Sequence, residues 1–167
     1  MNIILIGGEF KIFIILIFIF FLFNFFGLNF LGDGAAYGVG FLLGYFLVNI
    51  SLIDQSISPY FIANLFWYPA FENLFSIIRR TSKSINNYLP DNKHLHHLIY
   101  KYLKEKNIFK KNFILSSSVG LIINLILIIS YTIGYNYLTN TAVQCILVLV
   151  NIFLYTIVYY SLAKKLN

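Results

Sequence analysis

Long apolar runs, separated by short polar segments, make up most of this chain. The runs cover residues 12–31, 35–53, 59–78, 113–135 and 141–162. Each is close to the length of about 20 residues that a helix needs to cross the hydrocarbon core of a bilayer. The pattern therefore predicts five membrane-spanning helices in a single membrane domain over residues 1–167.

A different pattern occupies the one long polar segment, residues 79–112. Its apolar positions recur at i, i+3, i+4, i+7 and i+8, a spacing typical of an amphipathic helix with one buried face. These positions are Leu95, Leu98, Ile99, Tyr102 and Leu103. We therefore expect an all-α polytopic membrane protein, with about five transmembrane helices and one amphipathic helix outside the membrane.

Composition and charge support a membrane protein and give it an orientation. Hydrophobic residues make up 59% of the chain and charged residues 11%, whereas soluble domains carry about 25% charged residues. Nine of the twelve Lys and Arg residues lie between Arg79 and Lys111, and two more are Lys164 and Lys165. The positive-inside rule places this segment and the C-terminus in the cytoplasm, and the N-terminus outside. We expect the cytoplasmic (inner) cell membrane as the location and the lipid bilayer, not nucleic acid, as the partner.

All three histidines of the chain, His94, His96 and His97, lie at the start of the expected amphipathic helix. Asp91 is the expected N-cap, so the histidines fall in the first turns, where free backbone N–H groups and the helix dipole favour anions. This arrangement suggests a phosphate site. Two alternatives remain open: a solvated helix whose histidines have no chemical role, and a zinc site. Zinc is disfavoured because no cysteine lies nearby and no histidine pair has the i, i+4 spacing.

A carboxylate is expected at the same membrane surface as the histidines. Asp33 stands in the Gly32-Asp33-Gly34 turn before the second run, and counting helices places this turn on the cytoplasmic side. Asp33 could be a helix N-cap only. Together with the histidines, it is also what an active site on a membrane enzyme would require.

Two features of the apolar runs predict how the helices pack. The second run contains two small-xxx-small pairs that let another helix approach closely, which predicts a central position in the bundle. These residues are Gly34 with Gly38, and Gly40 with Gly44. Glu72 is the only acid in the third run, and a charge within the membrane is costly, so we expect it to face the bundle interior.

Three motifs carry a resemblance to a known family. They are the segments from Phe30 to Tyr37, from Tyr68 to Arg80 and from Pro90 to Leu98. In this order and spacing they resemble the polyprenyl-phosphate N-acetylhexosamine-1-phosphate transferases, glycosyltransferase family 4. The His-Leu-His-His form is most similar to the branch that starts O-antigen and related surface polysaccharides.

The resemblance implies a reaction and roles for four residues. The family transfers N-acetylhexosamine-1-phosphate from a UDP-sugar to polyprenyl (undecaprenyl) phosphate and releases UMP, with Mg²⁺, or Mn²⁺ in its place, as cofactor. Asp33 matches the catalytic, magnesium-binding aspartate of the family. His94, His96 and His97 match the residues that engage the diphosphate of the nucleotide sugar. Magnesium prefers carboxylate and phosphate oxygens, and phosphoryl transfer depends on positioning and charge neutralisation, so the chemistry of these residues is compatible with the roles.

One departure from the family pattern concerns the acids. The family also has an adjacent aspartate pair, whereas the six acids of this chain include no two neighbours. The resemblance therefore covers the C-terminal half of such an enzyme. We expect the chain to be inactive alone and to work with a second chain that carries the missing aspartates. The alternatives are a non-catalytic membrane remnant or assembly subunit and, less favoured because no internal repeat is found, a transporter component.

Overall fold

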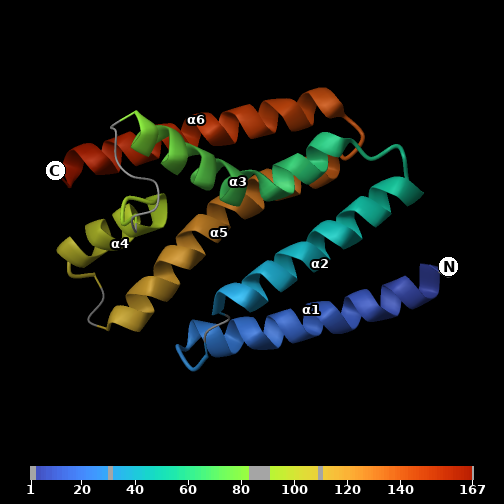
Figure 1. Ribbon diagram of the computed structural model, residues 1–167, viewed down its shortest axis with the longest axis horizontal. Coiled ribbons are helices and arrows are strands. Elements are labelled where there is room, and N and C mark those ends of the chain that lie inside the picture. Colours follow the sequence, from blue (N-terminus) through green and yellow to red (C-terminus); the bar gives the residue numbers. More distant parts are fainter. Residues whose placement is uncertain (1–2, 30–31, 83–90, 109–110, 167) are drawn as a thin grey trace.

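The computed structural model of the chain consists of helices joined by short connections (Figure 1). It describes residues 3–29, 32–82, 91–108 and 111–166, without the side chains of residues 3–10 and of Asp33. The helices are α1 (Ile3–Phe25), α2 (Gly32–Ile53), α3 (Pro59–Thr81), α4 (Leu95–Glu105), α5 (Asn112–Asn136) and α6 (Thr141–Lys165). No strand occurs in these ranges.

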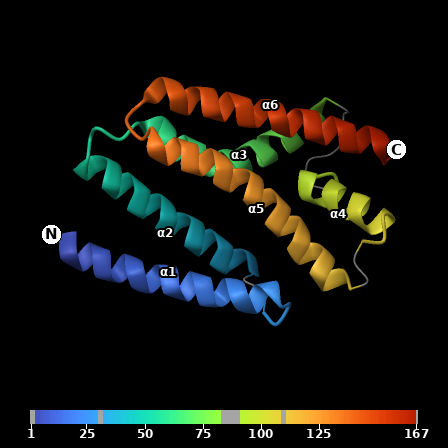
Figure 2. The same ribbon diagram turned by 180° about the vertical axis from the view of Figure 1, so that it is seen from behind.

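Five of the helices run back and forth along the length of the molecule, while the short α4 lies at one end (Figures 1 and 2). Helices α5, α6 and the Gly34–Ile53 part of α2 are long and apolar enough to cross a membrane. Helix α1 is apolar over Lys11–Phe25, and α3 is less apolar because it carries a polar stripe. The predicted all-α, polytopic membrane fold with one additional amphipathic helix is confirmed.

Helix α1 differs most from its predicted bounds, since it spans Ile3–Phe25 and not residues 12–31. Gly27 has a φ of 69°, and its N–H bonds to the carbonyl of Asn24 at 2.9 Å. The N–H of Leu28 bonds to the carbonyl of Phe23 at 3.0 Å. These two bonds form a Schellman motif, in which glycine adopts the left-handed conformation that ends a helix. The apolar run continues past this point, but the helix does not.

Helix α3 buries one polar residue on almost every turn. Ser58 caps its first turn, with its Oγ accepting from the N–H of Tyr60 at 3.3 Å, and Pro59 occupies the first helical position. The buried polar residues of this helix follow at spacings of four or eight. They are Asn64, Glu72, Ser76 and Arg80. Glu72 is 6% exposed, so its predicted interior position is confirmed.

A hydrogen-bonded network of four side chains joins α3, α5 and α6. Asn64 and Gln144 are fully buried, and the Nδ2 of Asn64 donates to the Oε1 of Gln144 at 3.4 Å. The Oδ1 of Asn64 accepts from Ser130 at 3.2 Å and from Asn151 at 3.3 Å. Gln144 in turn donates to the carbonyl of Gly134 at 2.7 Å. Polar side chains thus hold the three helices together within the apolar interior.

The predicted central position of α2 is wrong. The Gly34–Ile53 span has no buried residue, and it lies with α1 at the side of the bundle (Figures 1 and 2). A Cβ built on any of its four glycines, Gly34, Gly38, Gly40 and Gly44, would meet no described atom within 4 Å. Small residues permit a close approach, but nothing in the described part of the chain makes that approach.

Candidate functional site

Helix α4 is held against the ends of α3, α5 and α6 by the apolar stripe that its sequence predicts. Leu95, Leu98 and Ile99 are buried in a core that they share with Trp67 and Tyr155. The opposite face of α4, with His96 and His97, remains exposed. The amphipathic pattern therefore determines that the histidine face of α4, and not its apolar face, is available to bind a ligand.

The helix begins differently from the sequence expectation, because His94, not Asp91, is the N-cap residue. Its side chain makes no capping bond. The carboxylate of Glu72 from α3 supplies the cap, with Oε1 accepting from the N–H of Leu95 at 2.8 Å. The same oxygen lies 3.1 Å from the Nδ1 of His94. A buried carboxylate therefore already occupies the anion-favouring start of α4.

Asp91 is displaced from the cap position because it binds the end of α3. Its Oδ2 forms an ion pair with Arg79 and accepts from the Oγ of Ser76 at 2.5 Å, while Oδ1 accepts from the N–H of Lys93 at 3.0 Å. Burial opposes the charged form, but these hydrogen bonds and the Arg79 charge together hold the pKa of Asp91 below its usual range. The carboxylate is thus ionised at neutral pH, and it joins α3 to the segment before α4.

The three histidine rings gather at the start of α4 but face different surroundings. His94 and His96 are stacked, with centroids 5.5 Å apart, and the rings of His96 and His97 are 4.2 Å apart. His94 lies between two carboxylates, since its Nε2 is 3.8 Å from Asp91 and its Nδ1 contacts Glu72. His96 and His97 line a cavity instead.

This histidine cavity lies between α4 and α5 and has a volume of about 570 Å³. Its α4 side is formed by His96, His97 and Tyr100. Its α5 side is formed by Ser116, Val119, Gly120 and Ile123. The cavity therefore combines imidazole nitrogens with an apolar wall, a combination that suits an amphipathic ligand with polar anionic groups.

Burial and the neighbouring His97 lower the pKa of His96 below its ordinary value of 6.5. The ring is therefore mainly neutral at pH 7. A neutral imidazole has one N–H donor and one nitrogen acceptor, so His96 can bind a phosphate oxygen with a hydrogen bond that does not require a full charge.

Asp33 is the second residue of α2, and this helix begins on the side of the molecule that is nearer to α4 (Figure 1). Its side chain is outside the described part of the structure, as are Phe30, Leu31 and Pro90 of the motifs. The structure thus brings the three histidines together, and the position of the Asp33 carboxylate relative to them stays a prediction. A contact between Asp33 and the histidines is not among the described features.

The described residues do not by themselves form a metal site. They contain no group of three or more His, Cys, Asp and Glu side chains placed to hold an ion, which leaves the zinc alternative without support. Asp91 is engaged by Arg79, and Oε1 of Glu72 contacts His94 and the N–H of Leu95, while Oε2 of Glu72 is buried without a hydrogen-bond partner. One such oxygen does not make a magnesium site, so further carboxylates would have to come from Asp33 or from another chain.

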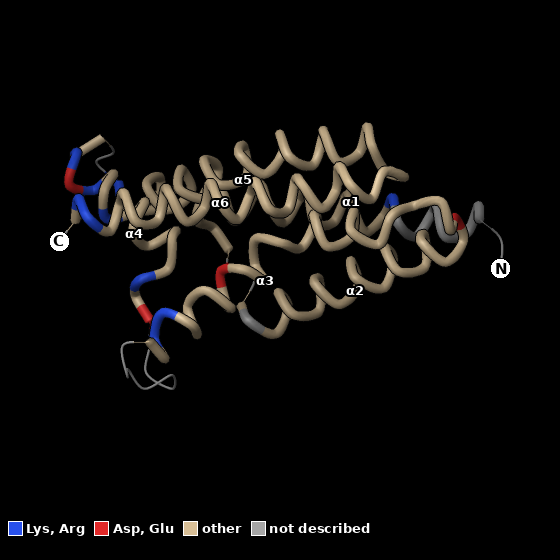
Figure 3. The backbone as a smooth tube through the Cα atoms, turned by 90° about the horizontal axis from the view of Figure 1, so that it is seen from above, with Lys and Arg blue, Asp and Glu red and all other residues tan. Residues whose placement is uncertain are grey.

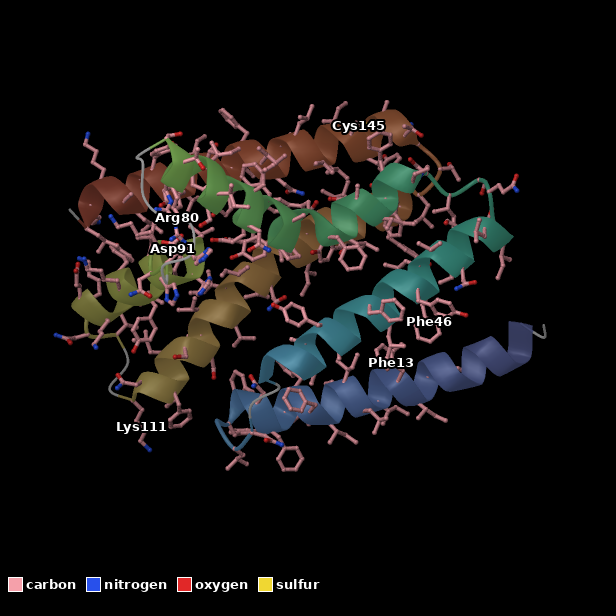
Figure 4. All side chains as sticks on the ribbon, viewed as in Figure 1. Phe13, Phe46, Arg80, Asp91, Lys111 and Cys145 are labelled. Carbon is pink, nitrogen blue, oxygen red and sulfur yellow. The ribbon has the colours of Figure 1, made fainter. Side chains whose placement is uncertain are left out.

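The sequence did not lead us to expect the ion pair of Arg79 with Asp91, or the hydrogen bond that Ser76 donates to the same carboxylate. A usable signal was present, because Ser76 follows Glu72 by one helical turn and Arg79 follows Ser76 by three residues, on the same side of α3. This stripe faces the start of α4. Figure 4 labels Asp91 at this corner, near the C-terminal end of α3.

Comparisons of the chain with protein-family models, with curated proteins and with solved structures give no match.

Proposed function

We propose that the chain supplies part of the active site of a phospho-N-acetylhexosamine transferase in cell-envelope polysaccharide synthesis. In this reaction an oxygen of polyprenyl phosphate attacks the sugar-bearing phosphorus of a UDP-N-acetyl sugar, and the bond to UMP breaks. The observation that carries the proposal is the histidine cavity, where His96 and His97 stand beside an apolar wall from α5. Both reacting molecules combine phosphate groups with bulky organic parts, and the acceptor is a lipid.

The proposed roles follow from the geometry around each residue. His96 and His97 would donate hydrogen bonds to the diphosphate, while Val119 and Ile123 would contact the prenyl chain. His94 is held by Glu72 and Asp91, so it would position the start of α4 and the two neighbouring imidazoles.

The resemblance to the transferase family assigns the metal to Asp33. Mg²⁺, or Mn²⁺ in its place, would neutralise phosphate charge there and would take its other oxygens from phosphate and water. Of the described carboxylates near the histidines, Asp91 binds Arg79 and one oxygen of Glu72 contacts His94, and the chain has no adjacent aspartate pair. We therefore propose a second chain as partner, with further aspartates, and a site that faces the cytoplasm.

A first experiment measures binding, because binding does not require the second chain. Purified chain is titrated with UDP-N-acetylglucosamine and Mg²⁺, and the variant His96→Ala/His97→Ala is compared with the control Glu105→Ala/Lys106→Ala, which changes exposed side chains outside the cavity. We expect the histidine variant to lose at least about ten-fold in affinity, since two hydrogen bonds to charged groups are removed. Equal affinities in the two variants would overturn the assigned role of the cavity.

A second measurement follows UMP release in membranes that contain polyprenyl phosphate, Mg²⁺ and the native set of membrane proteins. Asp33→Asn should lower the rate by about a hundred-fold, the usual cost of removing one electrostatic group from a transition state. Asp54→Asn, the same change at the opposite end of α2, should leave the rate unchanged. Binding of the UDP-sugar without any UMP release would favour the non-catalytic assembly subunit, for which the scarcity of carboxylates is the supporting observation.

A further inference from the structure

A second cavity, which we call the basic corner cavity, lies where the C-terminal ends of α3 and α6 meet α4. Its volume is about 620 Å³. Four cationic side chains from different segments line it: Arg79, Lys93, Lys101 and Lys164. The histidine cavity shares none of its lining residues. The two cavities therefore lie on different sides of α4.

The positive charge of this cavity is largely uncompensated. Arg79 is paired with Asp91, but its Nε is buried and has no hydrogen-bond partner. Lys101 donates to the main-chain oxygen of Leu166 at 3.2 Å. None of Lys93, Lys101 and Lys164 has an acidic partner in the part of the chain that is described. An anion could therefore bind without displacing an existing ion pair.

Apart from Asn92, the rest of the wall is apolar, and it lies at the charged C-terminal end of α6. Leu98, Ala163 and Leu166 contribute aliphatic surface, and Tyr159 and Tyr160 contribute rings. The apolar span of α6 ends here, at Lys164 and Lys165. Tyrosine and lysine at the end of a span are typical of the headgroup region of a bilayer. Figure 3 shows that Lys and Arg gather at this end of the molecule.

We propose that the basic corner cavity binds the phosphate headgroup of an anionic phospholipid from the cytoplasmic leaflet. Basic pockets between helices at this level bind such headgroups. The apolar wall favours a lipid over a soluble phosphate, because the glycerol and the first part of the acyl chains would cover Leu98 and Tyr160. The bound lipid would join α6 to α3 and α4. This site is independent of the proposed transferase activity.

The experiment uses the complete chain, delipidated in a neutral detergent, and counts bound lipids by native mass spectrometry. Phosphatidylglycerol is compared with phosphatidylcholine of the same acyl chains. We expect one phosphatidylglycerol to be retained in preference to phosphatidylcholine. The variant Lys93→Gln/Lys101→Gln/Lys164→Gln should lower the affinity about a hundred-fold, since each cation near an anionic headgroup contributes about five-fold.

The matched control is Lys104→Gln/Lys106→Gln/Lys111→Gln, which removes the same charge from exposed positions outside the cavity. Its affinity should change by less than about three-fold, since its lysines lie away from the headgroup. Equal losses in the two triple variants, or equal retention of the two lipids, would overturn the proposal. If the cavity variant does not fold, the exposed single change Lys164→Gln should still lower the affinity about five-fold.

Two further measurements test whether the cavity binds a lipid phosphate or a soluble phosphate compound. Inorganic phosphate and UDP are each added to the complex with phosphatidylglycerol at the concentration of the lipid. We expect neither to displace it. Displacement by inorganic phosphate or by UDP would assign the cavity to a soluble phosphate compound and overturn the lipid assignment.

Discussion

The bundle of α3 to α6 and the hairpin of α1 and α2 are held together in different ways. In the bundle, 22% of the α5 span and 17% of the α6 span are buried, whereas the α2 span has no buried residue. Polar side chains cross between the bundle helices, as in the pair of Asn64 and Gln144. Between α1 and α2 the described ring contact is that of Phe13 with Phe46, whose centroids are 5.8 Å apart (Figure 4).

The difference between the two regions follows from the lipid that would surround apolar helices. Lipid tails are as apolar as leucine, so an apolar helix gains little by exchanging lipid for a neighbouring helix. A buried amide or carboxylate, by contrast, has no alternative partner in hydrocarbon and selects the one arrangement that satisfies it. Hydropathy therefore identifies helices that are able to cross a membrane, such as α2, α5 and α6, but the polar residues determine which helices form the bundle.

The largest expected effect comes from Asp91, which joins α3 to the segment before α4. Asp91→Asn leaves Arg79 buried without its charged partner, and we expect a loss of about 3 kcal/mol in the free energy of unfolding at pH 7. The measurement is denaturation of the purified protein in mixed micelles. Asp54→Asn is the matched control, because Asp54 is fully exposed at the open end of the hairpin, and it should leave the stability nearly unchanged.

The same aspartate predicts a pH dependence. The pKa of Asp91 in the folded protein lies below its ordinary value of 3.8, so its stabilising contribution is complete above pH 3.8 and is lost as the pH falls through the lowered pKa. Asp91→Asn should remove this acid-dependent part of the unfolding curve. An unchanged acid dependence in the variant would assign it to other carboxylates.

Local patterns were sufficient to predict most of the fold. The expected runs 35–53 and 141–162 agree with the observed helices Gly32–Ile53 and Thr141–Lys165 within three residues at each end. The end of α1 was wrong because Gly27 stops a helix whose apolar pattern continues. The position of α2 was wrong because a glycine pair permits close packing without requiring it.

The candidate site was only partly predictable, because its contacts are long-range. The apolar stripe of α4 correctly gives its buried face, including Leu95 and Leu98. The cap comes from Glu72, 23 residues before Leu95, and no local rule could prefer it to Asp91. In the same way, Asn64 and Gln144 are 80 residues apart in sequence. Neither pairing leaves a periodic signal.

For the next pair of substitutions, we expect the change in the free energy of unfolding to have opposite signs in the bundle and in the hairpin. A Cβ at Gly134 of α5 would lie 2.7 Å from the Nδ2 of Asn64 and 3.1 Å from the Oε1 of Gln144. Gly134→Ala should therefore cost about 1 to 2 kcal/mol by displacing buried amides. Gly40→Ala in α2 meets nothing within 4 Å and should stabilise the protein by up to about 1 kcal/mol through helix propensity. Unfolding in mixed micelles measures both, and equal signs would contradict the proposed difference between bundle and hairpin.

The smallest effect concerns the hydrogen bond that connects the two regions, from the Oγ of Ser117 in α5 to the carbonyl of Phe25 in α1, at 2.9 Å. Ser117→Ala should weaken this connection by about 0.6 kcal/mol, the average for such bonds in membranes. Spin labels at Leu22 and Leu121 would measure it, since the population with separated labels should rise about three-fold. Ser116→Ala is the control because the Oγ of Ser116 bonds only within α5, to the carbonyl of Asn112. If both variants separate the labels equally, this hydrogen bond has no measurable part in holding the hairpin to the bundle.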